Sequence, residues 1–314
     1  MKKLILISCL LTFSILSFAQ HESQYTHFMY NYLPMNPGYA GAREVPSFTA
    51  LYRNQWVGFE GAPISQALSF NSPLLNDRVG FGLSILHRTA GITNSWTGSM
   101  AYSYDLKITE DLSLRIGLQG LVRFLGVDFS NEDVILHDLD DPSTMNGNNT
   151  SQYFGNFGIG AFGTYKDIYF GASIPRMLPV EIGFNTTSAE IAQEIPHAYF
   201  MTGGVFRLNQ RLRLRPALLG KYVEGAPLDF DINMSLLFEK DTSVGLSYRT
   251  GGSGIGESID LLVYFQINDR VGLGLSYDYI ISRLSRFQTG TFEALAKYDL
   301  TKRGSETISN PRFF

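Results

Sequence analysis

The feature that most constrains this 314-residue chain is a period-two alternation of apolar and polar side chains, repeated in segment after segment. In residues 112–124, leucine, isoleucine, valine and phenylalanine take alternate positions, and Arg115, Gln119 and Arg123 lie between them. This period places the two kinds of side chain on opposite faces of a β-strand. The pattern therefore predicts an all-β, antiparallel fold whose strands each have one apolar and one polar face.

Fourteen such segments can be counted, and the connections between them alternate in length. The predicted strands begin at Ser47, Ile64, Val79, Ser95, Leu112, Tyr153, Ile168, His197, Leu212, Asp229, Thr242, Ile259, Val271 and Thr291. Short turns lie at 76–78, 109–111, 166–167, 209–210, 239–241 and 268–270, and long loops at 127–152 and 175–196. Short turns at one end, long loops at the other and an even strand count are typical of a transmembrane barrel of the outer membrane. The even count predicts that both termini lie at the short-turn, periplasmic end.

A soluble β-sandwich has the same period, but three features favour the barrel. The polar face carries Arg, Lys and Asp in mid-strand, which a wet lumen accepts and a dry core does not. Tyrosines gather near strand ends, as an interfacial girdle does, namely Tyr102, Tyr104, Tyr248, Tyr277 and Tyr279. The chain also ends in two phenylalanines, Phe313 and Phe314. We therefore expect the apolar faces to meet outer-membrane lipid.

One nonapeptide occurs almost unchanged at two distant places, NDRVGFGLS at 76–84 and NDRVGLGLS at 268–276. Asn and Asp favour tight turns, and the residues that follow alternate large apolar with glycine or serine. Each copy is thus interpreted as a short turn that leads into a strand with one lipid-facing face and one small, polar face.

The ends of the chain are expected to lie outside the barrel strands. Residues 1–19 combine Lys2 and Lys3, an apolar stretch and the small-x-small site before Gln20, which predicts a cleaved signal peptide. Cys9, the only cysteine, lies inside this peptide, so the mature chain has none for disulfides or thiol catalysis. We expect a non-strand segment at 20–46, the barrel at 47–299 and a periplasmic tail at 300–314. No later apolar run approaches the ~20 residues of a membrane helix.

Motifs for catalysis, cofactors or nucleic acid are not found. The histidines have no metal-site spacing, and neither a GxSxG elbow nor a P-loop occurs. His87 is a mild candidate for a lipid-modifying barrel enzyme, although an ordinary interfacial histidine explains it. The acidic loop at 128–152 has carboxylates suited to a Ca²⁺ ion but lacks the EF-hand order, so we predict no metal and no cofactor. The net charge of −4 gives no sign of nucleic-acid binding.

Residues 20–46 are rich in aromatic residues and asparagine and are broken by Pro34 and Pro37. Such an apolar segment is not expected to be stable free in water, so we hypothesise that residues 24–32 form a short helix or turn, packed in the lumen or against a partner. Basic residues predicted to face the lumen would suit an anionic solute, although any wide barrel needs a polar interior: Arg115, Arg123, Arg213, Arg215, Lys221 and Arg249.

Three blocks of the chain resemble the PorP/SprF family of outer-membrane proteins of the type IX secretion system. The first is QYTHFMYN at 24–31 followed by NPGYAG at 36–41, the second RNQWVGFEGAPIS at 53–65, and the third SNPRFF at 309–314. The resemblance implies a non-enzymatic barrel that helps to export a secreted adhesin-like cargo, used in gliding or surface attachment, or holds its C-terminal domain at the cell surface. It also implies contact with an OmpA-like periplasmic lipoprotein and components of the secretion ring.

Within these blocks, aromatic and proline residues are the candidate partner contacts: Trp56, Phe59, Pro63, Tyr25, Phe28 and Tyr39. Trp56 equally suits the outer aromatic girdle. Two alternatives remain beside secretion: a porin-like or hydrophobic-solute channel, which predicts an open, conducting lumen, and a lipid-modifying enzyme, which predicts loss of activity in His87→Ala.

Overall fold

The computed structural model describes residues 24–43, 45–75, 77–128, 150–182, 192–238, 242–251 and 256–300. The predicted signal peptide, most of the acidic loop, residues 183–191 and the tail from residue 301 lie outside these ranges, as does Asn76 in the first copy of the repeat.

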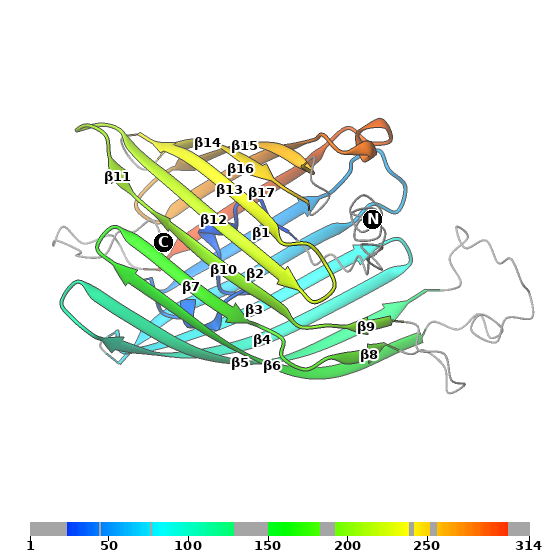
Figure 1. Ribbon diagram of the computed structural model, residues 1–314, viewed down its shortest axis with the longest axis horizontal. Helices are drawn as coiled ribbons and strands as arrows, with labels where there is room; N and C mark the ends of the chain where they lie inside the picture. Colours follow the sequence, from blue (N-terminus) through cyan, green and yellow to red (C-terminus); the bar gives the residue numbers. More distant parts are fainter. Residues whose placement is uncertain are drawn as a thin grey trace, which may run out of the picture.

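Fourteen strands form a closed antiparallel β-barrel, as predicted (Figure 1). They are β1 (Ser47–Asn54), β2 (Ile64–Leu74), β3 (Val79–Ala90), β4 (Thr93–Lys107), β5 (Leu112–Val127), β6 (Thr150–Tyr165), β7 (Ile168–Ile174), β10 (His197–Gly204), β12 (Arg213–Val223), β13 (Asp229–Leu237), β14 (Ser243–Arg249), β15 (Ser258–Gln266), β16 (Val271–Ile280) and β17 (Thr291–Asp299). Each strand pairs with its sequence neighbours, and β1 pairs with β17 to close the ring. Every predicted strand start lies within three residues of an observed one.

The smaller elements lie at the ends of the barrel or inside it. β11 (Phe206–Arg207) prolongs β10 along β12, and β8 (Val180–Ile182) pairs with β9 (Ala192–Glu194) in a separate hairpin. The 3₁₀ turns η1 (Phe28–Tyr30) and η2 (Pro37–Tyr39) precede β1, and η4 (Arg283–Arg286) joins β16 to β17. No helix in the described part of the chain is long and apolar enough to cross a membrane.

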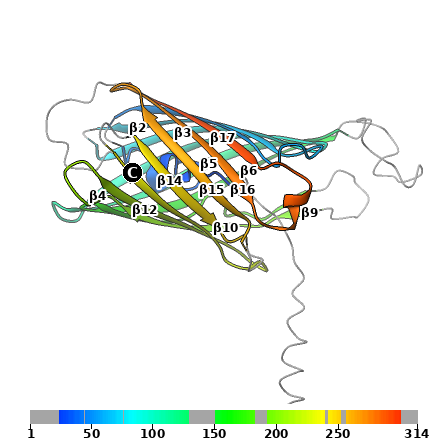
Figure 2. The ribbon, with the colours of Figure 1, turned by 90° about the horizontal axis from the view of Figure 1, so that it is seen from above.

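The two ends of the barrel differ as the sequence predicts. Short turns join β2 to β3, β4 to β5, β6 to β7, β13 to β14 and β15 to β16, and we call this the short-turn end. The other end, which carries the β5–β6 and β7–β10 connections and η4, is the long-loop end. Figure 2 shows β9 and, in orange beside it, η4 at this end of the barrel. Ser47 and Asp299 pair at the short-turn end, as an even strand count requires.

The alternation of the sequence becomes the two faces of the wall. On β5, Leu118 is 60 % exposed on the outside, whereas Arg115 and Gln119 are buried on the inside. The tyrosines Tyr102, Tyr104, Tyr248 and Tyr279 are exposed on the outer face. The buried apolar cluster of the protein lies inside the lumen, between the wall and residues 25–42. The barrel is therefore filled, and what fills it is its own N-terminal segment.

Candidate functional site: the plugged lumen

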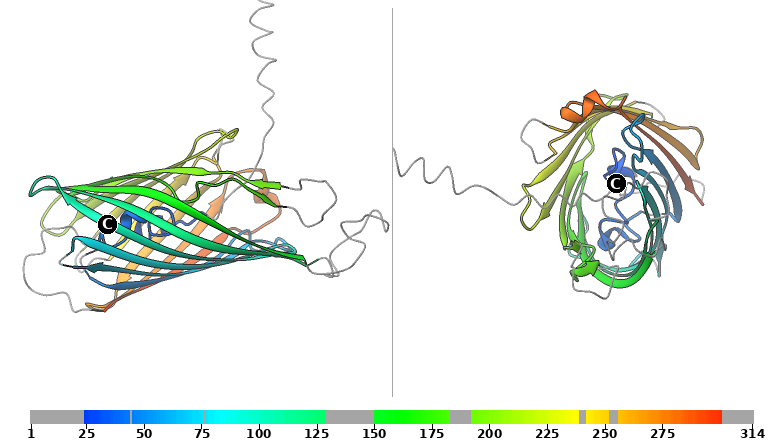
Figure 3. Two further views of the ribbon diagram at one scale, coloured as in Figure 1. Left: turned by 90° about the horizontal axis from the view of Figure 1, so that it is seen from below. Right: turned by 90° about the vertical axis from the view of Figure 1, so that its right-hand side faces the viewer.

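Residues 24–43, which we call the plug, run inside the barrel along its length (Figure 3). At one end, the Gln24 side chain donates a hydrogen bond of 2.6 Å to Asp229, the first residue of β13. At the other, Arg43 forms an ion pair of 2.9 Å with Asp299, the last residue of β17. Since β13 begins at the long-loop end and β17 ends at the short-turn end, the plug crosses from one to the other. The two ends of the described chain therefore lie at opposite ends of the barrel, which the strand count alone does not indicate.

The second half of the plug lies directly on glycines of the inner wall. A Cβ atom built on Gly80 would lie 1.9 Å from the Ala40 carbonyl oxygen, and one on Gly117 would lie 2.3 Å from that of Pro37. Side chains of the plug lie as close to three more glycines, Leu33 at Gly82 and Asn36 at both Gly160 and Gly171. We call these five glycines on four strands the glycine floor: Gly80, Gly82, Gly117, Gly160 and Gly171. Only a residue without a side chain allows so close an approach of two backbones. The small face of the repeated nonapeptide thus has a specific role in its first copy, where Gly80 and Gly82 support the plug.

Hydrogen bonds fix the plug backbone on this floor. Ser103 donates to the carbonyl of Ala40 at 2.6 Å, and Ser173 donates to that of Met35 at 2.7 Å. The Asn36 side chain donates to the Ala161 carbonyl at 2.9 Å and accepts from Gly38 within its own turn. Buried backbone groups need such partners, so the NPGYAG block docks the plug onto the barrel's own wall.

Aromatic rings fill the space between the plug and β6 and β7. Tyr32 and Tyr39 of the plug pack against Phe162 and Tyr169 of the wall, with ring centroids 5.1–6.1 Å apart. The hydroxyls of Tyr32 and Tyr169 share a hydrogen bond of 2.5 Å. All four rings are at most 2 % exposed, so side chains occupy the lumen at this level.

The first half of the plug is held differently, by a buried ion-pair network near the long-loop end. Arg53 of β1 lies 2.7 Å from Asp278 and 3.0 Å from Glu293. Asp231 lies 2.6 Å from Arg249 and 2.9 Å from Lys221, so two of the predicted lumenal cations are neutralised. Each of these side chains is at most 9 % exposed.

The plug completes this network with polar groups. The Thr26 hydroxyl donates to Asp278 at 2.8 Å, and the Thr26 amide donates to Glu293 at 3.0 Å. His27 contacts Glu293 through its amide and its ring Nδ1, both at 2.8 Å. Arg53 also donates to the Thr26 hydroxyl, at 3.1 Å. The RNQW block and the QYTH block of the sequence therefore meet inside the lumen.

The opposite wall carries a second set of charges. Residues 175–178, after β7, fold back onto the inner wall, where Gln119 donates to the Pro175 carbonyl at 2.7 Å. Glu194 of β9 lies 2.7 Å from Arg176 and 3.0 Å from the predicted lumenal Arg123. The long β7–β10 connection is thereby tied to the barrel interior.

The six predicted partner residues fall into two groups. Phe28 and Tyr39 are buried in the lumen, and Tyr25 is half-buried there, so they contact the barrel itself. That these three residues contact a partner stays a prediction. Such contact would require a segment of the partner to enter the barrel. Sequence reasoning missed Arg53 and the glycine floor. The signal for both was their place on the polar, small face of their strands, β1 for Arg53 and β3, β5, β6 and β7 for the glycines.

The other three residues lie in the β1–β2 loop at the long-loop end. Phe59 is 47 % exposed, Trp56 is partly buried and Pro63 is buried. Val57 exchanges backbone hydrogen bonds of 2.8 Å with Gly290 and Thr289 of the β16–β17 loop. The loop is thus fixed, and among these three residues Phe59 presents the exposed ring.

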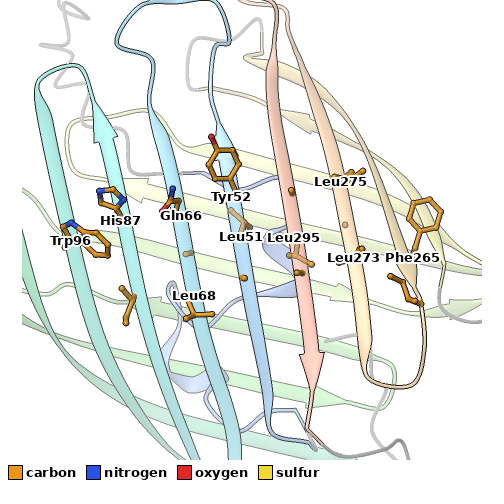
Figure 4. A pocket seen from close by; sticks show the side chains of 17 residues that line it. Leu51, Tyr52, Gln66, Leu68, His87, Trp96, Phe265, Leu273, Leu275 and Leu295 are labelled. Carbon is orange, nitrogen blue, oxygen red and sulfur yellow. The ribbon is translucent and has the colours of Figure 1, made fainter.

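The outer wall carries a shallow apolar groove of about 960 Å³ across β1, β2, β16 and β17 (Figure 4). Alanines of β1, β2 and β17 line it together with larger apolar side chains and with His87. The His87 ring stacks on Trp96, with ring centroids 4.1 Å apart, and contacts Asn94 at 3.0 Å. His87 thus has the contacts of an interfacial histidine. Nowhere in the described ranges do three His, Cys, Asp or Glu side chains gather as a metal site would require. The acidic loop at 128–152, where a Ca²⁺ ion was considered, falls mostly outside those ranges.

Comparison with known proteins adds a family and a fold. A family model described as "Type IX secretion system membrane protein PorP/SprF" matches residues 17–298. A search of curated proteins found no match. The toluene transporter TodX of Pseudomonas putida is 10 % identical, with a TM-score of 0.51 over 86 % of this chain and 93 % of its own. The toluene transporter TbuX of Ralstonia pickettii is also 10 % identical, with a TM-score of 0.50 over 88 % and 93 %. At such identities these two structures show the shared barrel fold alone.

Proposed function

This chain belongs to the PorP/SprF family of type IX secretion system membrane proteins, and we propose that it supports the export or surface attachment of a secreted, adhesin-like cargo. It is an outer-membrane β-barrel. The main support for this proposal is the plug, which hydrogen bonds and ion pairs hold to the wall from Gln24 to Arg43. A barrel filled in this way is suited to present surfaces at its two ends, rather than to pass solutes through its middle.

The proposed orientation places the long-loop end outside the cell and the short-turn end in the periplasm. Short periplasmic turns and longer external loops are the usual arrangement in this class of barrel. Loops on a rigid scaffold commonly carry binding function. The cargo's C-terminal domain would then dock on the long-loop end, while an OmpA-like lipoprotein and ring components would meet the charged short turns.

Phe59 is the residue we expect to contact the cargo most directly, because its ring is exposed on a loop that is already fixed. We expect Phe59→Ala to lower the amount of cargo that co-purifies with the tagged barrel about tenfold, the loss of an aromatic anchor of roughly 1.4 kcal/mol. Phe206→Ala is the matched control, since Phe206 is 44 % exposed at the short-turn end. Purification from native outer membrane in mild detergent, followed by quantitative mass spectrometry, measures both. Equal cargo recovery from the two variants would reject Phe59 as an anchor.

Transport of a small apolar solute is the second candidate function. Two barrels of similar fold are described as toluene transporters, and an apolar groove lies on the outer wall. This alternative requires a path through or beside the plug. Steady ion conductance of the unmodified protein in a planar bilayer, together with the absence of any co-purifying secreted protein, would favour it over secretion.

The path of the plug predicts where the mature N-terminus lies. If cleavage follows Ala19, residues 20–23 separate the new N-terminus from Gln24 and span at most about 14 Å. We therefore expect an epitope inserted after Gln20 to be labelled by antibody on intact cells, like one inserted after Gly147. An epitope after Phe314 should be labelled only in permeabilised cells. Labelling at 147 without labelling at 20 would contradict the path of the plug, and surface labelling at 314 would overturn the proposed orientation.

A further inference from the structure

The two halves of the plug are held by different kinds of contact. Residues 33–41 lie on the glycine floor, where backbone meets backbone and aromatic rings interlock. Residues 24–27 are held by hydrogen bonds to Asp229, Asp278 and Glu293 near the long-loop end. Asp278 and Glu293 each lie two residues from the end of their strand, a depth of roughly 7 Å. A segment arriving at that end therefore meets the polar half of the plug first.

The wall that binds residues 24–27 carries more acidic than basic side chains. Five buried carboxylates face the lumen on β13, β15, β16 and β17, and we call them the carboxylate wall: Asp229, Asp231, Asp260, Asp278 and Glu293. Three fixed cations, Arg53, Lys221 and Arg249, form ion pairs with them. Five carboxylates against these three cations leave an excess of two acidic side chains, and the next cations, Arg215 and Lys297, lie against the Tyr30 ring.

The excess is most evident at Asp260. This side chain is 1 % exposed, and its Oδ1 has no hydrogen-bond partner among the described residues. The hydroxyl of Ser276 nearby on β16 is also buried without a partner in the same part of the chain. Asp260 pairs in register with Asp278, which accepts the Thr26 hydroxyl. The unsatisfied oxygen is therefore adjacent to the site that the plug occupies.

The plug itself brings no fixed cation to this wall. Gln24 offers an amide, Thr26 a hydroxyl and a backbone amide, and His27 a backbone amide and an imidazole. A guanidinium or ammonium group adds the attraction of opposite charges to such hydrogen bonds, and a guanidinium can also donate two parallel bonds to one carboxylate. A segment with arginine or lysine at the same place would satisfy the wall better than the plug does.

From this mismatch we propose that the carboxylate wall is a binding site for a basic peptide segment, which enters from the long-loop end and displaces residues 24–27 of the plug. The glycine floor retains residues 33–41, so the barrel stays closed while the segment binds. Assigning the segment to the secreted cargo rests on the proposed function, whereas the binding site itself does not.

Octa-arginine tests the site in the purified, full-length barrel, with octa-glutamate as the matched control. We expect octa-arginine to raise the rate of chymotryptic cleavage after Tyr25 and Phe28 at least tenfold, and octa-glutamate to leave it unchanged. The effect should weaken as salt is added, since it depends on charge. Unchanged cleavage with octa-arginine, or equal cleavage with both peptides, would overturn the proposal.

Variants locate the bound peptide. The double variant Asp229→Asn, Asp260→Asn should lower the affinity for labelled octa-arginine at least tenfold. The triple variant Asp138→Asn, Asp140→Asn, Asp141→Asn in the acidic loop should leave it unchanged. The opposite pattern would place the peptide on the loop and reject the wall. Asp260→Asn alone, which breaks none of the described ion pairs, replaces the double variant if that one does not fold.

The test of this binding site and the test of the proposed function can fail independently of each other. Binding of octa-arginine to the wall, with no cargo recovered from native membranes, would keep the site and reject the secretion role. Recovery of cargo without any effect of octa-arginine would keep the secretion role and reject the binding site on the wall.

Discussion

Replacing Gly117 with valine is expected to expel the second half of the plug and to turn a closed barrel into a conducting one. A Cβ at this position would lie 2.3 Å from the Pro37 carbonyl oxygen and 2.4 Å from the Gly38 nitrogen, and neither backbone can yield. Valine is itself well suited to a β-strand, so the ladder of β5 should form as before. The conflict is therefore confined to the contact between wall and plug.

Gly120→Val is the matched control for this prediction. Gly120 lies three residues further along the same strand and faces outward, and a Cβ added there would have no atom within 4 Å. We expect this variant to match the unmodified protein in planar-bilayer conductance and in chymotryptic cleavage after Tyr32 and Tyr39. Gly117→Val should show new conductance steps and rapid cleavage at those two tyrosines. Equal behaviour of the two variants would mean that the glycine floor does not hold the plug.

Much of the fold could be predicted because its signal is local. Alternation within residues 112–124 determines which side of the wall each side chain faces, whatever the neighbouring strands are. The repeated turn at 76–78 and 268–270 likewise marks the short-turn end without knowledge of the partner strand. Strand number, strand order and the two faces of the wall follow from such patterns.

The site could be predicted only in part, because its contacts join distant parts of the chain. Thr26 binds Glu293, 267 residues away, and nothing in the sequence around either residue indicates the other. The sequence does indicate that residues 24–32 are too apolar to remain in water. It does not distinguish a lumen from a partner surface, since Phe28 and Tyr39 would be equally suited to either. Likewise, the glycines of NDRVGFGLS indicate a small face but not which segment lies on it.

Arg53→Ala is expected to be among the most destabilising single substitutions in the barrel. It would remove the 2.7 Å and 3.0 Å ion pairs of Asp278 and Glu293, both fully buried, and leave Glu293, among the described residues, only His27 at 2.8 Å and Asp278 only Arg249 at 3.7 Å. Removing one partner of a buried pair typically costs about 3–5 kcal/mol, because the remaining charge is less well compensated and still lacks water. It would also remove a donor to Thr26, so chymotrypsin should cleave after Tyr25 and Phe28 more readily than after Tyr39. This pattern is the reverse of that expected for Gly117→Val, whose conflict lies in the other half of the plug.

Urea unfolding of the barrel in lipid vesicles measures this cost against two controls. Lys166→Ala removes an exposed pair with Asp111 at 3.9 Å, which should change the free energy of unfolding by at most about 1 kcal/mol. Arg53→Lys keeps the positive charge but lacks the planar guanidinium group that donates to both carboxylates at once. The stability of this variant should therefore fall between those of Arg53→Ala and the unmodified protein. If Arg53→Ala unfolds at the same urea concentration as Lys166→Ala, the network does not stabilise the barrel, and its role must be sought in binding alone. A large loss that Glu293→Ala partly restores would instead show that the cost arises from the uncompensated carboxylate.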